Sequence, residues 1–257
     1  STRVRSSAAS DVYKRQHNVN LVYTYLPTSA DKTYFLPPTL TNGNVHGIIV
    51  LNVYNERLLR LLAETQIPKV FLDTSSLVAP DELNGDLLLM ESRTSVRRIT
   101  SHLLEQGRTL PGFIGDIGYA QSNRERYEGF CQALTDAGKK VDSSLCLTTP
   151  LGIDTYREEI DTFLSSLSRM PDAFVCASDY VACILMQLLE KRGLRVPEDV
   201  AVSGFDNNTE DLLAEHLTTV QVFNEELGAR LALQILYRIK YPNTPHEITY
   251  LGTNVLY

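Results

Sequence analysis

The chain has 257 residues, enough for one large domain or two small ones. Its hydrophobic fraction of 43% and charged fraction of 21% are typical of water-soluble globular proteins. The net charge is -7, and the basic residues are spread among more numerous acids. Because phosphate contacts need clustered Lys and Arg, this composition argues against direct nucleic-acid binding. No apolar run approaches the roughly 18 residues of a membrane span, and we expect no secretion signal.

The residues that could ligate metals or form disulfides show no ordered spacing. The five histidines are scattered, so no zinc site is predicted. Four cysteines also lack metal-type spacing, and we expect reduced thiols in a cytoplasmic protein. These cysteines are Cys131, Cys146, Cys176 and Cys183.

Signature motifs of enzymes are missing from the sequence. It has no G-x-S-x-G, H-E-x-x-H or phosphate-loop GK[ST] pattern. The glycines at 112, 115 and 118 follow an apolar run, but their spacing is not that of a dinucleotide site. We therefore predict no enzymatic activity, no cofactor and no metal.

Apolar strands alternate with amphipathic helices along most of the chain, after a polar leader at 1–17 that we expect to be disordered and non-native. Strands are predicted at 20–25, 47–51, 69–73, 86–90, 112–115, 144–147, 173–177, 200–205, 218–222, 247–251 and near 255. Helices are predicted at 55–65, from about 95 to Gly107, at 123–137, 155–169 and 178–191, briefly from Thr209, and at 225–240. Strands separated by helices imply right-handed crossovers and parallel sheets.

Polar side chains follow several of the predicted strands, and the clearest is Asp206 after the apolar run 200–205. Ligands bind outside the carboxyl ends of parallel strands, so Asp206 is a binding-site candidate. Arg126 lies early in a helix that follows another strand. Carboxylates accept hydrogen bonds from hydroxyl groups of a ligand, and guanidinium groups donate to its oxygens. The alternative is that Asp206 only caps a turn and Arg126 is a solvated helix residue.

The stretch VPEDVAVSGFDN, followed by LTTV, resembles the effector-binding domain of lactose-repressor/galactose-repressor (LacI/GalR) transcription regulators. The resemblance runs from about Val19 to the C-terminus, and it is also specific at 112–116, 124–130 and 176–180. It implies an α/β, two-lobed periplasmic-binding-protein-like fold. Each lobe would be a parallel sheet flanked by helices.

By this resemblance the first lobe comprises 18–90 and 223–241, and the second comprises 91–222 and 242–257. Family members begin this domain with a further strand and helix, preceded by a helix-turn-helix and a hinge. We expect these segments to be missing from this fragment. The first lobe would then lack an interior strand, and its neighbours would lose a pairing partner.

The resemblance also implies which residues contact the effector. Arg126 matches an effector-contacting arginine, Asp206 a hydroxyl-binding aspartate, and Asp73 a first-lobe aspartate. Ser178 stands where asparagine is common, which alters the expected pocket. The full predicted set is Asp73, Ser122, Arg126, Tyr156, Ser178 and Asp206.

The resemblance predicts the sensor domain of a cytoplasmic transcriptional repressor that binds a mono- or disaccharide between its lobes. It implies a homodimer that contacts operator DNA only through the missing helix-turn-helix, with no membrane partner and no DNA-binding residue in this chain. Two alternatives remain open. One is a periplasmic sugar-binding protein that serves a transporter. The other is a small-molecule enzyme with Asp116 or Asp206 as its base.

Overall fold

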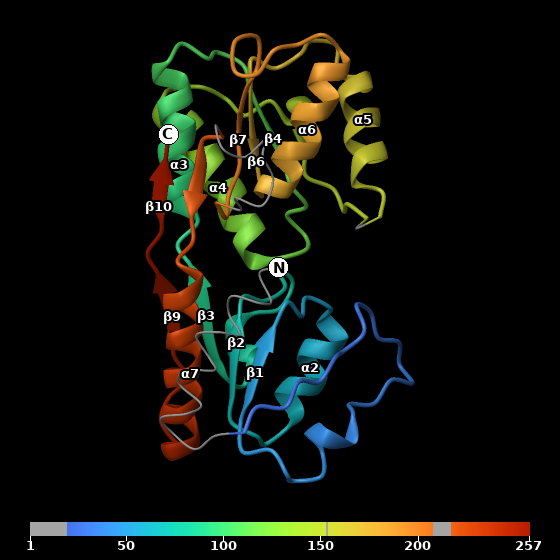
Figure 1. Ribbon diagram of the computed structural model, residues 1–257, viewed down its shortest axis with the longest axis vertical. Coiled ribbons are helices and arrows are strands. Elements are labelled where there is room, and N and C mark those ends of the chain that lie inside the picture. Colours follow the sequence, from blue (N-terminus) through green and yellow to red (C-terminus); the bar gives the residue numbers. More distant parts are fainter. Residues whose placement is uncertain (1–19, 153, 208–216) are drawn as a thin grey trace. The chain divides into compact units, whose positions relative to one another are not determined.

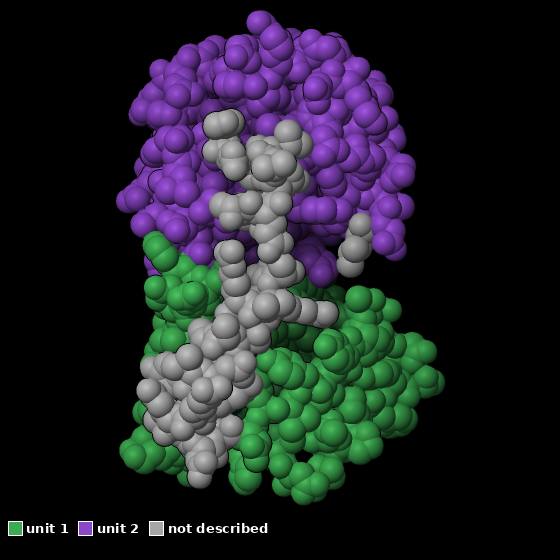
Figure 2. Space-filling model, viewed as in Figure 1, with its two compact units in different colours: residues 1–90, 223–251 green, residues 91–222, 252–257 purple. Residues whose placement is uncertain are grey.

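The computed structural model describes residues 20–152, 154–207 and 217–257. The chain divides into two compact units, coloured separately in Figure 2. Unit 1 comprises residues 1–90 and 223–251, and unit 2 comprises 91–222 and 252–257. Within the described ranges, none of the helices has the length and apolar character needed to cross a membrane.

Unit 1 is built on a four-stranded parallel sheet with the order β1-β2-β3-β9 (Figure 1). Its strands are β1 (Ile48–Leu51), β2 (Lys69–Leu72), β3 (Asp86–Met90) and β9 (Ile248–Leu251). Its helices are α2 (Glu56–Glu64) and α7 (Asn224–Lys240), with short 3-10 turns η1 (Pro38–Leu40) and η2 (Pro80–Leu83). The alternation of helices and parallel strands confirms the predicted fold class for this unit.

The core of unit 1 follows the period-two alternation of its strands. Phe71 and Leu87 point to the face covered by α2, where they join Leu59 and Leu62. Because successive strand residues point to opposite faces, Val70 points the other way, toward the side on which α7 packs against β1 and β2. Both faces of the sheet are therefore covered, as is usual for parallel sheets.

A buried ion pair fastens the end of α7 to the sheet of unit 1. Arg238 and Asp86 are only 2% and 1% exposed in their side chains. Arg238 donates from Nη2 to Asp86 Oδ1 and from Nε to Oδ2 at 3.0 Å, so the contact is bidentate. The Asp86 carboxylate also accepts from Gln234 Nε2 at 2.7 Å and from the backbone N–H of Glu247 at 2.9 Å. This network aligns the start of β9 with the start of β3.

The strand predicted at 20–25 is wrong. These residues form no strand in the structure, and Leu21, Val22, Tyr23 and Tyr25 are exposed. A strand needs a hydrogen-bonded neighbour, and β1 ends the sheet of unit 1 without a further described strand beside it. The segment is apolar, as a strand would be, but it has no hydrogen-bonded partner strand among the described residues.

The C-terminal segment also differs from the expected lobe boundaries. Residues 242–257 were assigned to the second lobe, but β9 pairs with β3 and belongs to unit 1. Only 252–257 lie in unit 2. The reason is the ion pair described above, which holds the start of β9 against unit 1.

Unit 2 contains a four-stranded parallel sheet with the order β5-β4-β6-β7 (Figure 1). Its strands are β4 (Pro111–Ile114), β5 (Cys146–Leu147), β6 (Ala173–Cys176) and β7 (Ala201–Ser203), with η3 (Ser143–Leu145) leading into β5. Its helices are α3 (Arg93–Glu105), α4 (Gln121–Asp136), α5 (Tyr156–Ser166) and α6 (Asp179–Lys191). A separate antiparallel pair joins β8 (Thr219–Gln221) to β10 (Asn254–Leu256). The short helix predicted from Thr209 lies outside the described residues.

Two apolar clusters cover the two faces of the unit 2 sheet. On one face, Leu185 of α6 and Ile160 of α5 pack on Phe174. On the other, Ile99 of α3 and Phe130 of α4 pack on Phe113. Both clusters consist of the helical stripes expected from the sequence, and the predicted fold class is confirmed here too.

Helices α3 and α4 approach each other closely at Gly129. A Cβ atom added to Gly129 would lie 2.2 Å from the carbonyl oxygen of Arg93, the first residue of α3. Such a contact is far inside van der Waals distance. Only glycine permits this spacing, which sets how α4 sits against its neighbour.

Candidate functional site

The carboxyl end of β7 presents Asp206 on an unusual backbone. After Ser203, the chain passes through Gly204 and Phe205, and Asp206 donates its backbone N–H to the carbonyl oxygen of Val220 at 2.9 Å. Asp206 and Asn207 have φ values of 111° and 50°. Asn and Asp tolerate the left-handed region better than other side chains do, which suits them to this turn. The turn holds the Asp206 carboxylate at the end of the strand.

Arg126 reaches the same place from the second turn of α4. Its side chain is only 6% exposed. One terminal nitrogen, Nη1, donates to the carbonyl oxygen of Ala177, just past the end of β6. The guanidinium carbon lies 3.6 Å from the centroid of the Phe205 ring, a cation–π contact. Arg126 is therefore not a solvated helix residue.

The two charged groups face each other without completing a hydrogen bond. Arg126 Nη2 and Asp206 Oδ1 are 3.8 Å apart, which is beyond hydrogen-bonding distance. The buried Arg126 Nε has no hydrogen-bond partner among the described residues. The Asp206 side chain keeps 46% of its surface accessible. The pair thus has donors and acceptors available to a ligand that carries hydroxyl groups.

The Asp206 carboxyl group is partly desolvated by the surrounding protein, although part of its side chain stays accessible. This burial raises its pKa to about 6, because a desolvated carboxylate is less stable when charged. Arg126 opposes the rise, and the nearby Asp179 carboxylate adds to it. Near neutral pH the group is mainly ionised and able to accept hydrogen bonds.

Asp179 supports this strand end from the start of α6. Its Oδ1 atom accepts from Thr219 Oγ1 at 2.6 Å, and its backbone N–H donates to the Phe205 carbonyl at 2.8 Å. A Cβ atom on Gly204 would lie 2.1 Å from the same Oδ1, so glycine is required there. The link of Asp179 to Phe205 and Thr219 depends on the tertiary fold, so no local sequence pattern reveals it.

The two predicted serines lie near the pair but differ in their surroundings. Ser122 is 5% exposed and lies one helical turn before Arg126 on α4. Ser178 is the N-cap of α6, and its hydroxyl oxygen accepts from the Val181 N–H at 3.3 Å. Helix capping therefore accounts for a serine at position 178 without a ligand.

Tyr156 begins α5 and packs edge-on against Tyr180 of α6, with ring centroids 5.8 Å apart. Burial raises the pKa of its phenol, and the neighbouring Tyr119 and Asp116 raise it further. No hydrogen bond or ring contact joins Tyr156 to Arg126 or Asp206 in the described part of the chain. The structure therefore places Tyr156 in an aromatic group of its own within unit 2.

Asp116 follows β4 and was considered as an enzymatic base. Its Oδ1 atom accepts from the Gly118 N–H at 2.8 Å, and Oδ2 lies 3.4 Å from the Leu151 nitrogen. Both carboxylate oxygens thus organise the loops after β4 and β5. This arrangement favours a structural role for Asp116.

Asp73, the predicted residue of unit 1, follows β2 with a φ of 62° and is 4% exposed. Its Oδ1 atom accepts from the Thr74 N–H at 2.8 Å, and its own N–H donates to the Leu88 carbonyl at 2.9 Å. Its local geometry parallels that of Asp206, since both follow a buried strand in the left-handed region.

The residue that sequence reasoning missed is Phe205, the ring beneath Arg126. It is fully buried, and its letter was counted as part of an apolar strand. The available signal was an aromatic residue directly before the strand-end aspartate. Among the described residues no group of three His, Cys, Asp or Glu side chains is arranged to hold a metal ion.

Parallel sheets flanked by helices, with an acidic and a guanidinium group at strand ends, define an α/β ligand-binding protein. A family model described as "periplasmic binding protein-like domain" matches residues 100–257. The repressor PurR of Glaesserella parasuis serovar 5 is 25% identical over 237 residues, covering 91% of this chain and 68% of that protein. Against other curated PurR repressors, the chain spans about three fifths of their length, at 61% and 60%.

Solved structures agree with this assignment. A complex of the transcriptional regulator CelR with cellobiose has a TM-score of 0.72 and 26% identity, covering 85% of this chain and 67% of that one. A LacI-family regulator from Enterococcus faecium with bound ribose has a TM-score of 0.77 and 21% identity, covering 100% and 92%. The chain belongs to the LacI/GalR family and carries its periplasmic binding protein-like, effector-binding domain. The proteins it matches here are transcriptional regulators.

Proposed function

We propose that this domain senses a mono- or disaccharide through Arg126 and Asp206, and that sugar binding controls a transcriptional repressor. The observation that carries the proposal is the incomplete pairing of these two groups. A buried guanidinium with an unsatisfied Nε faces a half-accessible carboxylate at 3.8 Å. A sugar hydroxyl can accept from the first and donate to the second at the same time.

The ligands bound to two of the similar proteins support this chemistry. CelR was solved with cellobiose, and the Enterococcus faecium regulator with ribose. Both ligands are neutral polyols without a charged group. The Phe205 ring, 3.6 Å from the Arg126 guanidinium carbon, helps to hold that group beside Asp206.

We infer the remaining roles from the family. The protein would act in the cytoplasm as a homodimer and catalyse no reaction. It would bind operator DNA through a helix-turn-helix segment, as the name of the HTH-type repressor PurR indicates for that protein. A ligand can control such a protein only by binding one conformation more tightly than another. Asp73, Ser122, Tyr156 and Ser178 remain predicted effector contacts.

Calorimetric titration with a panel of mono- and disaccharides tests the proposal. We expect one class of sugar to bind without being converted, with conversion followed by NMR of the recovered sugar. Arg126→Ala and Asp206→Ala should each weaken binding about ten- to a hundredfold, the usual loss for charge-assisted hydrogen bonds. Arg169→Ala, which removes an exposed arginine elsewhere in unit 2, is the matched control and should bind as the unaltered protein does.

Circular dichroism of each variant separates lost binding from lost folding. Unchanged affinity in a folded Arg126→Ala protein would remove that residue from the site. Turnover of the bound sugar would favour the enzyme alternative.

A further inference from the structure

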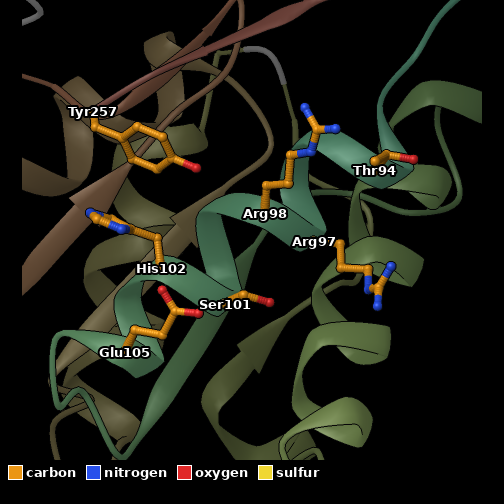
Figure 3. Close-up of a pocket in the computed structure, with 7 residues that line it drawn as sticks. All are labelled: Thr94, Arg97, Arg98, Ser101, His102, Glu105 and Tyr257. Atoms are coloured by element: carbon orange, nitrogen blue, oxygen red, sulfur yellow. The ribbon is translucent and has the colours of Figure 1, made fainter.

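The outer face of α3 forms a polar groove that the strand-end site does not use (Figure 3). Its volume is about 360 Å³, near the lower end of the range for small-molecule sites. Thr94, Arg98, Ser101, His102 and Glu105 line it from the helix, at spacings that place them on one helical face. Tyr257, directly after β10, forms the opposite wall.

The groove contains one guanidinium group, that of Arg98, whose hydrogen-bond donors are not used by the described residues. Across the described ranges, the Arg98 guanidinium makes no hydrogen bond or ion pair. The adjacent Arg97 donates through Nε to Asp136 of α4 at 2.6 Å, which leaves its two terminal nitrogens outside this bond. Glu105 is the acid that lines the groove, at the end of the helix. Because Arg97 is already paired with Asp136, the Arg98 guanidinium is the group in this groove that can donate to an anionic ligand.

Two rings give the groove a flat wall. The His102 and Tyr257 ring centroids are 4.2 Å apart, with the planes inclined by 50°. His102 is further held by Gln106, whose Nε2 lies 2.8 Å from His102 Nε2. Figure 3 shows the Tyr257 ring beside His102, with the Arg98 side chain rising from the same helix. Aromatic rings in this position can contact the apolar face of a sugar or base.

Both walls of the groove are also tied to the places where the chain passes between units. Helix α3 begins just after residue 91, and β10 follows residue 252. Thr253 joins them, since its Oγ1 donates to the Glu91 carbonyl at 2.9 Å and lies 2.8 Å from Ser95 Oγ. A ligand that contacts both α3 and Tyr257 would therefore bind next to two of the segments that connect the units.

We propose that this groove is a second small-molecule site, specific for a phosphate ester of a small sugar. The guanidinium group of Arg98 and the hydroxyls of Thr94 and Ser101 would bind the phosphate oxygens. The sugar ring would lie against Tyr257 and His102. This ligand differs in charge from the neutral polyol proposed for Arg126 and Asp206, so the two sites are chemically distinct.

The absence of tryptophan from the chain allows a local test. Tyr257→Trp places a single indole in the groove wall, so its fluorescence reports binding there and not at the strand-end pair. We expect glucose 6-phosphate to change this fluorescence saturably, and glucose at equal concentration to leave it unchanged. Adding Arg98→Gln should weaken the glucose 6-phosphate response about tenfold or more. Adding Arg169→Gln, the charge-matched change elsewhere on unit 2, should leave it intact.

Calorimetry on the chain with its native Tyr257 repeats the comparison of Arg98→Gln with Arg169→Gln, in case the indole itself disturbs the wall. No saturable binding of glucose 6-phosphate in either assay would overturn the proposal, and so would equal weakening by the two arginine variants. If inorganic phosphate binds as tightly as glucose 6-phosphate, the role given to the two rings is wrong.

Discussion

Each unit of this protein contains an Arg–Asp pair beside its parallel sheet, with the aspartate at the start of β3 in unit 1 and after the end of β7 in unit 2. The two pairs differ in how many of their possible hydrogen bonds are made. Arg238 and Asp86 in unit 1 are both almost fully buried, and their contact is bidentate. The Arg238 guanidinium also donates to the carbonyls of Thr244 and Pro245. Arg126 and Asp206 in unit 2 remain 3.8 Å apart, with one buried nitrogen unsatisfied and the carboxylate half exposed.

The difference separates a structural pair from a binding pair. Where every donor and acceptor is used, the pair has nothing left to offer a ligand and instead fixes two chain segments. Where a guanidinium and a solvent-accessible carboxylate lie too far apart to bond to each other, an incoming hydroxyl group can bond to both. The same two residue types therefore serve opposite purposes, and their surroundings decide which.

The largest expected effect comes from breaking the saturated pair. Arg238→Met should lower the free energy of unfolding by about 3–5 kcal/mol, because it leaves the Asp86 carboxylate buried without its cation. Urea denaturation followed by circular dichroism measures the loss. A decrease below about 1 kcal/mol would contradict the structural role, since exposed pairs contribute no more than that.

Breaking the unsaturated pair should cost less stability. Arg126→Met removes one hydrogen bond to the Ala177 carbonyl, but Asp206 keeps access to solvent. We expect a loss of about 1–2 kcal/mol in the same urea assay, the range for one buried hydrogen bond. A loss equal to that of Arg238→Met would mean that the two pairs do not differ as described.

Acid titration should distinguish Asp206 from its amide variant. Its pKa is raised from 3.8 to about 6 on folding, so between these values the folded protein holds a proton that the unfolded chain has released. This group therefore makes stability fall as pH rises from about 4 to about 6, after which the effect is constant. Asp206→Asn removes this contribution. The urea midpoint of the unaltered protein minus that of Asp206→Asn should decrease from about pH 4 to about pH 6 and stay constant above that. If the two midpoints instead change in parallel with pH, the pKa of Asp206 is not raised.

The smallest effect is expected for the exposed pair of Arg195 and Asp199 in unit 2. Its hydrogen bonds are short, at 2.8 and 2.9 Å, and they hold the pKa of Asp199 near 2. Solvent screens the pair, however, so Arg195→Gln should leave the urea midpoint unchanged within error. A clear shift would show that close geometry alone, without burial, decides the value of an ion pair here.

Most of the fold followed from local patterns in the sequence. The stripes on α3, α4, α5 and α6 were legible because each helix buries one face, and β6 because it is apolar throughout. The segment at 20–25 failed because strand formation depends on a distant partner, which no local pattern contains. The position of β9 depended on Asp86 and Arg238, residues 152 positions apart whose contact no periodicity reveals.

The site was predictable in its residue types and less so in its geometry. Asp206 stood out because a carboxylate ended a buried strand, and Arg126 because it matched a family motif. That Arg126 is buried on Phe205, and that its Nε is left unsatisfied, follow from contacts of α4 with the segments after β7 and β6, which no local pattern reveals. For Ser178 the resemblance predicted an effector contact, whereas the structure shows its hydroxyl capping α6.

The close approach of α3 and α4 at Gly129 connects the Arg126–Asp206 site with the groove on α3. Arg126 lies one turn before this glycine on α4, and the groove with Arg98 is lined by residues of α3. A single added methyl group would push the Arg93 carbonyl away and move one helix along the other. A substitution at Gly129 would therefore change the surroundings of Arg126 and of the groove at the same time. The two surfaces share one structural constraint.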